Sequence, residues 1–468
     1  MRKLLLAVLA VALCALPAYA SVQNIKVSGD IDSSYVFRRD FNFGATTEGE
    51  SVNDHEYQSL FMTQTRLRVD ADLTDNVAAT VALINERIWT NLQTSASTDI
   101  DLNLAYVTLR EMLYSPLTLV IGRQDFRYGN SFIIDSAGPN HVASGDSGLQ
   151  GAVEDLSKQS AFDAIRAILD YSPLKVELAY VELSPRMNGA GSLDDFSLDH
   201  SNNGKKLYGG NATYEFGDDM NSLVEAYVWY KIDKSNEEVS GTQGAKADTV
   251  LVKGLRGSIT PIDRLNLQLE YAIQTGTKRL SDSIYQQRRA HAVQAMASFQ
   301  LPLLEEYMPV LTYSFTKATG ESDDVTQKDG VFTAWDVMFE NQATGKIYNT
   351  LFQPSNYIMN EVTLSAVPME DLSAALSLSI LKLERKLTSD SSALSLVQPD
   401  DDDASVTDEL GSLLLGKEID LVLKYDYTED VQLGANMGWF FPGTVFKVTD
   451  DPNSNAAKQL ILNCLVKF

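Results

Sequence analysis

The chain has 468 residues and carries 63 acidic against 38 basic side chains, with hydrophobic residues making up 44% of it. A surface this acidic argues against a nucleic-acid partner, because proteins bind nucleic acid through basic patches. Two cysteines and four scattered histidines show no metal-ligand spacing, so the sequence predicts no metal site and no cofactor.

The first twenty residues, "MRKLLLAVLAVALCALPAYA", combine two positive residues, an apolar run over 4–16 and a small-residue site ending at Ala20. The apolar run is shorter than the about 20 residues of a transmembrane helix. We therefore predict a signal peptide, residues 1–20, cleaved after Ala20. The mature chain, 21–468, keeps 36 basic and 63 acidic side chains, a net charge of −27, and one cysteine, Cys464.

Segments in which apolar and polar residues alternate follow one another along the mature chain, bounded by turn residues. Eighteen are predicted as strands: Val22–Arg38, Ser59–Leu73, Asn76–Ile88, Ile100–Arg110, Pro116–Arg123, Gln159–Leu169, Pro173–Leu183, Lys206–Phe216, Met220–Ile232, Asp248–Thr260, Asp263–Thr275, Gln287–Gln300, Tyr307–Lys317, Asn356–Val367, Asp371–Leu383, Lys417–Tyr427, Asp430–Phe441 and Gln459–Phe468. The connections between them alternate strictly, eight being short and nine long.

An outer-membrane barrel needs this asymmetry, because it has an even number of tilted strands, short periplasmic turns and long external loops. Hydrocarbon cannot hydrogen-bond the backbone, so a spanning sheet must close and leave no edge. We predict an all-β fold: one transmembrane antiparallel β-barrel of about 18 strands over 21–468, in the outer membrane of a Gram-negative-type envelope, with both termini periplasmic. A soluble sandwich would show the same alternation with the apolar face inward.

The alternation is clear in "DRLNLQLEYAI", where Leu267 and Leu269 share one face and Gln268 and Glu270 the other. In "KEIDLVLKYDY" the leucines likewise oppose Asp420 and Lys424. Lipid explains the apolar face and a wet lumen the polar face. Aromatic residues near strand ends fit interfacial girdles; these are Tyr35, Phe37, Trp89, Tyr171, Phe216, Trp229, Tyr230, Phe315, Tyr427, Trp439, Phe440 and Phe441.

The final segment, "KQLILNCLVKF", is amphipathic and carries an aromatic residue at its last alternate position, Phe468. Such an ending resembles the C-terminal signal by which outer-membrane proteins are recognised for insertion. We therefore expect the barrel-insertion machinery to be a partner, through Phe468, and lipopolysaccharide and other outer-membrane lipid to surround the barrel.

Basic residues occur at predicted lumen positions, where burial is costly without a function or a partner. The candidates for the lumen and substrate pathway are Arg66, Arg68, Arg110, Arg123, Arg127, Arg166, Arg256 and Lys424. A guanidinium fork matches the two oxygens of a carboxylate, so these residues could pass carboxylated solutes or a polyuronate chain. Arg/Asp pairs that only keep the barrel round and wet are the alternative.

Three segments resemble the alginate-export family of outer-membrane barrels: "LVIGRQDFRYGNSFI", "AFDAIRAIL" and "GKEIDLVLKYDYTEDVQLGANMGWFFPGTVF". They occur in the family's order, and the similarity in length and strand count covers the mature chain. The resemblance implies an 18-stranded barrel whose arginine-rich lumen passes an anionic polysaccharide outward. By motif match it implies that Arg123 and Arg166 are lumen arginines.

The long connection Gln124–Lys158 contains "SFIIDSAGPNHVASGD", whose apolar residues are poorly suited to open water. We expect this loop to fold into the barrel and narrow the pore; packing on neighbouring loops outside is the alternative. The acidic runs "QPDDDDASVTDE" and "GESDDVTQKDG" are expected to be solvated loop segments.

No Ser/His or Asp/His pattern indicates an enzyme, so we predict no catalytic residues. No plug domain precedes the first strand, which argues against an active transporter. The predicted function is a passive outer-membrane channel for anionic polysaccharide or small anionic solutes, through an Arg-containing lumen. The alternative is a general or substrate-selective diffusion porin for small solutes.

Overall fold

The computed structural model describes residues 24–41, 43, 57–89, 100–136, 153–184, 204–234, 246–280, 284–321, 330–386, 413–446 and 455–468. The predicted signal peptide lies outside the described residues, as do the acidic run 400–403 and most of the segment 320–330. In the described part, no helix is both long and apolar enough to cross a membrane.

Nearly all the regular structure is β-strand. The strands are β1 (Asn24–Arg39), β2 (Tyr57–Thr74), β3 (Val77–Ile88), β4 (Asp101–Leu109), β5 (Leu117–Gln124), β6 (Phe162–Asp170), β7 (Leu174–Ser184), β8 (Lys205–Glu215), β9 (Leu223–Asp233), β10 (Asp248–Ile262), β11 (Leu265–Arg279), β12 (Tyr285–Gln300), β13 (Val310–Ala318), β14 (Val331–Phe332), β15 (Tyr357–Met369), β16 (Leu372–Leu383), β17 (Leu414–Asp426), β18 (Val431–Pro442) and β19 (Ala457–Lys467). The short helical turns are η2 (Glu154–Leu156), η3 (Glu305–Tyr307), η4 (Thr444–Phe446) and α2 (Ile347–Leu351).

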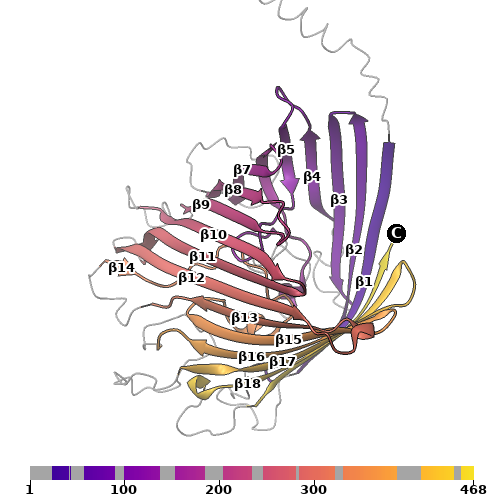
Figure 1. The fold of residues 1–468 in the computed structure, drawn as a ribbon, viewed down its shortest axis with the longest axis vertical. Coiled ribbons are helices and arrows are strands. Elements are labelled where there is room, and N and C mark those ends of the chain that lie inside the picture. The colour runs from indigo at the N-terminus through magenta and orange to yellow at the C-terminus, as the bar shows by residue number, and fades with distance from the viewer. Residues whose placement is uncertain are drawn as a thin grey trace, which may run out of the picture.

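The wall is a closed antiparallel cylinder of 18 strands, in which each strand pairs with its neighbours in the chain (Figure 1). Ten residue pairs, from Asp30↔Lys467 to Arg39↔Lys458, join β1 to β19 and close the seam. The one further strand in the described residues, β14, has two residues, lies outside the 18-stranded wall and pairs with β12 in parallel. The predicted strand number, pairing and alternation of short and long connections are confirmed.

The predicted segments differ from the strands only at their ends. The segment predicted to begin at Tyr307 begins as β13 at Val310, because η3 occupies Glu305–Tyr307 and the Leu301 N–H bonds the Pro309 carbonyl at 2.8 Å. β11 runs past Thr275 to Arg279, since the pairing with β12 continues to Arg279↔Tyr285. Strand ends depend on pairing partners that local alternation does not specify.

The faces of the wall follow the predicted alternation. On β11 the outward Leu269 and Tyr271 are exposed, whereas the inward Glu270 and Gln274 are buried. Two members of the predicted aromatic girdle are corrected: Trp229 and Phe440 are 1% and 0% exposed and face inward, in the core.

The seam relies on the lack of a side chain at Gly29. Its N–H bonds the Phe468 carbonyl at 2.8 Å, and the Phe468 N–H bonds the Gly29 carbonyl at 3.0 Å. A Cβ at Gly29 would lie 2.6 Å from Cζ of the Phe468 ring and 2.5 Å from the Arg66 carbonyl oxygen. The strand that closes the barrel therefore packs its last ring where only glycine leaves room.

We predict that Gly29→Val destabilises the folded barrel by about 1–3 kcal/mol, the usual cost of overpacking. Urea midpoints followed by the heat-dependent gel mobility of the folded barrel measure this. Ser33→Val, on the same outward face of β1, serves as the control. Equal midpoints for the Gly29 variant and the wild type would show that the seam does not depend on this contact.

Candidate functional site

The third long connection folds into the barrel, as predicted. Its first described stretch, 125–136, buries Phe126, Phe132 and Ile134 against apolar residues on the inner wall. The Tyr128 ring lies 5.3 Å from the ring of Trp229 on β9. The inner wall is therefore not uniformly polar: an apolar patch on β6–β12 holds this loop by hydrophobic burial.

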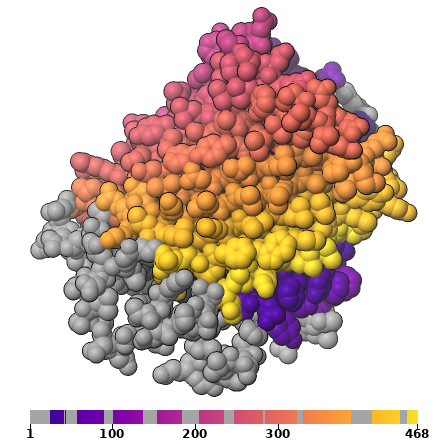
Figure 2. Space-filling model, turned by 60° about the horizontal axis from the view of Figure 1, so that its bottom comes forward, coloured from indigo at the N-terminus to yellow at the C-terminus, as the bar shows by residue number. Residues whose placement is uncertain are grey.

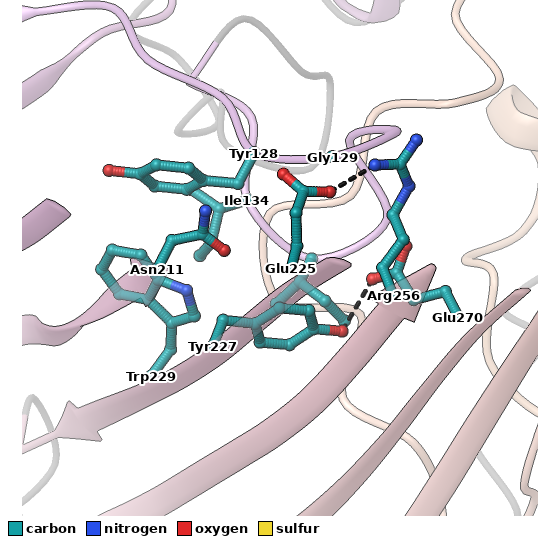
Figure 3. A pocket seen from close by; sticks show the side chains of 10 residues that line it. Tyr128, Gly129, Ile134, Asn211, Glu225, Tyr227, Trp229, Arg256 and Glu270 are labelled. Carbon is teal, nitrogen blue, oxygen red and sulfur yellow. Dashed lines mark hydrogen bonds and ion pairs between the residues drawn. The ribbon is translucent and has the colours of Figure 1, made fainter. Parts of the chain in front are cut away.

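Polar contacts fix the same stretch beside that patch (Figure 3). Arg256 on β10 forms an ion pair with Glu225 on β9, and its Nη2 donates to the Asn130 side chain at 3.1 Å. Tyr227 donates to Glu270 at 2.7 Å. A Cβ at Gly254 would lie 2.2 Å from the Tyr227 ring, so this glycine makes room for the inward tyrosine.

The second described stretch, 153–161, is held on the opposite side of the cylinder by ion pairs. The Arg38 Nη2 lies 2.7 Å from Asp155 Oδ2, and Arg38 is 2% exposed. Lys158 Nζ lies 2.7 Å from Asp32 Oδ2. Glu86 on β3 accepts from the Ser157 hydroxyl at 2.6 Å and from the Lys158 N–H at 2.7 Å. Both stems of the loop are thus anchored inside the lumen.

The seventh connection also folds inward, which the sequence reading missed. Asp336 pairs with Lys231 on β9 at 2.5 Å, and its backbone N–H and carbonyl both bond Gln274 on β11. Further along, Glu418 on β17 accepts the N–H groups of Ile347 and Tyr348 at 2.7 and 2.9 Å. Contacts to strands this far apart place the segment inside the cylinder.

The two loops bond to each other as well as to the wall. The Phe339 N–H bonds the Ile133 carbonyl at 3.0 Å, and the Asp135 N–H bonds the Phe339 carbonyl at 2.9 Å. The Gln342 side chain donates to the Asn130 carbonyl at 2.9 Å. They therefore form one folded body across the lumen, which we call the lumen insert: residues 125–136 and 330–351.

A cavity of about 430 Å³ lies between the lumen insert and the wall formed by β12, β13 and β15. Its lining is mostly uncharged and polar: Arg127, Gly129, Asn130, Ser131, Gln294, Met296, Thr312, Ser314, Asn341, Gln342, Lys346, Tyr348, Met359 and Glu361. Lys346 and Glu361 form an ion pair. Arg127 is exposed, and the described residues offer its side chain no acidic partner, so the charged lining sums to +1.

Four of the predicted pathway residues lie in the lumen but are ion-paired. Arg66 and Arg68 lie 2.8 Å from Asp30 and Asp70 respectively. Arg166 lies 3.7 Å from Glu177 and over the Phe126 ring, and Arg256 pairs with Glu225. In each pair the carboxylate neutralises the guanidinium and occupies some of its N–H donors.

The prediction that Arg123 faces the lumen is wrong. Its register partners are Ala105 and Asp163, on the same outward face as Ile121 and Ile165, and its Nη1 lies 3.5 Å from Asp163 Oδ2. The motif match implied a lumen position, but strand register turns this side chain away from the lumen.

Arg110 and Lys424 lie away from the cavity. Arg110 follows the end of β4, and its Nη1 is 3.5 Å from the Asp75 carbonyl oxygen in a neighbouring short turn. Lys424 faces inward near the end of β17, opposite Ser373 and Gly434, and is exposed. The eight predicted residues therefore do not form one continuous ladder.

The sequence reading missed Arg38, Lys231 and Lys346. The inward position of Arg38 could have been predicted from its own strand, because Asp30, Asp32 and Ser34 occupy the same alternate face. Lys231 also fits the inward alternation of β9. Lys346 carried no signal, because its position depends on the unpredicted infolding of the seventh connection.

Charged groups on the wall strengthen the attachment of the lumen insert. Burial raises the pKa of Asp336, but Lys231 and Arg288 outweigh that effect and hold the pKa at about 2. On the third connection, burial together with Glu177 raises the pKa of Tyr128, so its hydroxyl stays protonated and donates to Glu177 at 3.2 Å. In the part of the chain that the structure describes, no His, Cys, Asp and Glu side chains group in threes to hold a metal.

Comparison with known proteins agrees with this architecture. The family model described as "Alginate export" matches residues 24–459. The chain belongs to the alginate-export family. No curated protein sequence matches it.

Solved structures of three Pseudomonas aeruginosa proteins are similar in fold. OccK1 (OpdK) has a TM-score of 0.55 at 11% identity, with 96% of this chain and 99% of that chain covered. OccK2 (OpdF) has a TM-score of 0.53 at 12% identity, with 96% and 99% covered. OpdQ has a TM-score of 0.52 at 12% identity, with 96% and 98% covered. This alginate-export family member is an outer-membrane β-barrel, and its family and fold indicate a transport channel rather than an enzyme.

Deleting Ser131–Gly148 should raise single-channel conductance, because it removes the apolar residues and backbone bonds that hold the lumen insert together. Planar-bilayer recording measures this. The control removes the same number of residues, 389–406, from the eighth connection. Unchanged conductance after the first deletion would show that the insert does not limit ion flow.

Asp336→Asn should loosen the insert by roughly 1–2 kcal/mol, because Lys231 loses its carboxylate and Arg288 keeps only Asp248. A lowered pKa means that this stabilisation is full above about pH 4 and lost as pH falls through about 2. Wild-type conductance should therefore stay constant from pH 7 to about 4. The variant should show frequent large openings already at pH 7. Steady currents like those of the wild type would contradict the role of Asp336 in holding the lumen insert to the wall.

Proposed function

We propose that the protein is a passive channel for anionic, carboxylate-bearing solutes, which cross the lumen through the cavity beside Arg127. The observation that carries this proposal is the position of Arg127 in the wall of the 430 Å³ cavity, exposed and without an acidic partner in the described part of the chain. A guanidinium with free donors can grip a carboxylate with two parallel hydrogen bonds.

The surroundings of Arg127 suit such a solute. Amide and hydroxyl groups, including those of Asn341 and Ser314, supply donors and acceptors for sugar hydroxyls. Met296 and Met359 supply apolar contact. Fixed charge in a narrow, weakly screened passage acts locally, so the net charge of −27 does not prevent anion passage there.

The ion-paired arginines favour a second candidate, a diffusion porin for small solutes. Arg66, Arg68 and Arg256 each have a carboxylate within hydrogen-bond reach, which leaves their part of the lumen near neutral. Such a lumen would select by size rather than by charge. The two candidates differ in ion selectivity and in block by a polyuronate.

The test compares Arg127→Gln with Arg123→Gln, which removes the same charge four residues earlier from the outer face. In a salt gradient across a planar bilayer, the wild type and the Arg123 variant should prefer anions and be blocked by oligouronate. The Arg127 variant should lose most of that preference, several-fold in permeability ratio, together with the block.

A current that is linear with voltage and needs no energy source would agree with passive transport. Cation selectivity of the wild type, or equal behaviour of the two variants, would contradict the proposal and favour the diffusion porin. Comparing uronate monomers with oligomers of increasing length would show which chain length the cavity accepts.

A further inference from the structure

On the outer face of five neighbouring strands, β16 to β19 and β1, all the charged side chains are cations. Strand register assigns each residue of these strands to the inner or outer face. Apart from four cations, every outward residue there is uncharged and most are apolar. The cations are Lys382, Lys417, Lys458 and Arg39, which we call the basic rim. Four of the five strands thus each place one cation on the outer face.

All four members of the basic rim lie at the same edge of the barrel. Lys382 and Arg39 are at the ends of β16 and β1, and Lys417 and Lys458 are near the starts of β17 and β19. This is the edge from which the long connections leave. Figure 2 shows the outer surface of the later strands as adjacent bands from orange to yellow. Four strand spacings of about 4.8 Å separate β16 from β1, so the rim spans roughly 19 Å.

The neighbours of the basic rim place it at a membrane interface. Lys458 pairs in register with Trp439 on one side and Arg39 on the other, and Arg39 pairs with Tyr57. Lys417 pairs with Phe441. Outward tryptophan and tyrosine mark the headgroup level of barrel proteins, and lysine stems extend from apolar surface toward that level.

Elsewhere on the same edge, three outward cations have acidic neighbours, whereas Arg87 on β3 and Arg289 on β12 have none among the described residues. Lys317 lies 3.2 Å from Glu384, Lys206 lies 3.7 Å from Glu182, and Arg123 pairs with Asp163. In the described part of the chain no acidic partner is recorded for the three lysines of the rim, although Arg39 lies 3.3 Å from Asp40. The three lysines of the rim are thus left to be neutralised from outside the protein.

We propose that the basic rim binds the phosphate groups of lipopolysaccharide, the phosphorylated glycolipid of the outer leaflet. The ligand must be a lipid, because the rim lies directly above an apolar belt, and it must be anionic, because four cations face it. Barrels of this membrane carry their long loops outside, which places the rim at the outer leaflet. This inference concerns the outer surface and goes beyond the proposed channel function.

The test uses the purified full-length barrel in detergent, titrated with fluorescent lipopolysaccharide and checked for bound lipid by native mass spectrometry. K417Q/K458Q removes two rim lysines. K26Q/K467Q removes two lysines that face inward at the opposite end of the barrel and is the matched control. Single-channel conductance of both variants shows that each is folded and is read independently of lipid binding.

K417Q/K458Q should bind lipopolysaccharide at least about tenfold more weakly than the wild type, while K26Q/K467Q binds like the wild type. Lipopolysaccharide stripped of phosphate should bind the wild type as weakly as it binds K417Q/K458Q. Binding should survive chelation of magnesium, because lysine contacts phosphate directly. Unchanged affinity of K417Q/K458Q, an equal loss in the control, or equally tight binding of phosphatidylglycerol would each overturn the proposal.

Discussion

The whole structure depends on the need of every backbone N–H and C=O in the membrane for a partner within the protein. A sheet with a free edge fails that requirement, so the chain must return and pair its last strand with its first. The pairing of β1 with β19, extended by the two bonds between Gly29 and Phe468, meets it. Closure then fixes two surfaces with different solvents, and the two-residue period of the strands distributes side chains between them.

The inner surface combines two kinds of environment. On β6–β12 it is apolar enough to bury Phe126, Ile134 and Phe339 of the lumen insert, while ion pairs such as Arg38–Asp155 hold the other stem of the third connection. Most lumen arginines are neutralised by neighbouring carboxylates. This pairing lowers the free-energy cost of burying charged residues at membrane depth. In the channel that we propose, selectivity rests on Arg127, the one cation of the described cavity lining without a carboxylate partner.

Much of the fold could be predicted from the sequence. A closed barrel requires alternating side chains in each strand and alternating short and long connections, and both patterns appear locally in the sequence. The infolding of the third connection was also readable, from apolar residues in a loop. What could not be read depends on register and on distant contacts. Arg123 matches a family motif, yet its pairing with Asp163 turns it outward. Trp229 looks like an interfacial residue, but it faces a loop 100 residues earlier in the chain. The inward course of the seventh connection depends on Lys231, Gln274 and Glu418, which no local pattern links to it.

The claim that the chain forms a closed cylinder with lipid outside and water inside is tested most directly along one strand. Single spin labels placed in turn at positions 265 to 269 of β11, in barrels reconstituted into vesicles, report contact with oxygen in lipid or with a water-soluble relaxation agent. The account predicts strict alternation, with labels at Leu267 and Leu269 in lipid and labels at Asn266 and Gln268 in water. Reversed alternation, or one environment along the whole strand, would contradict it.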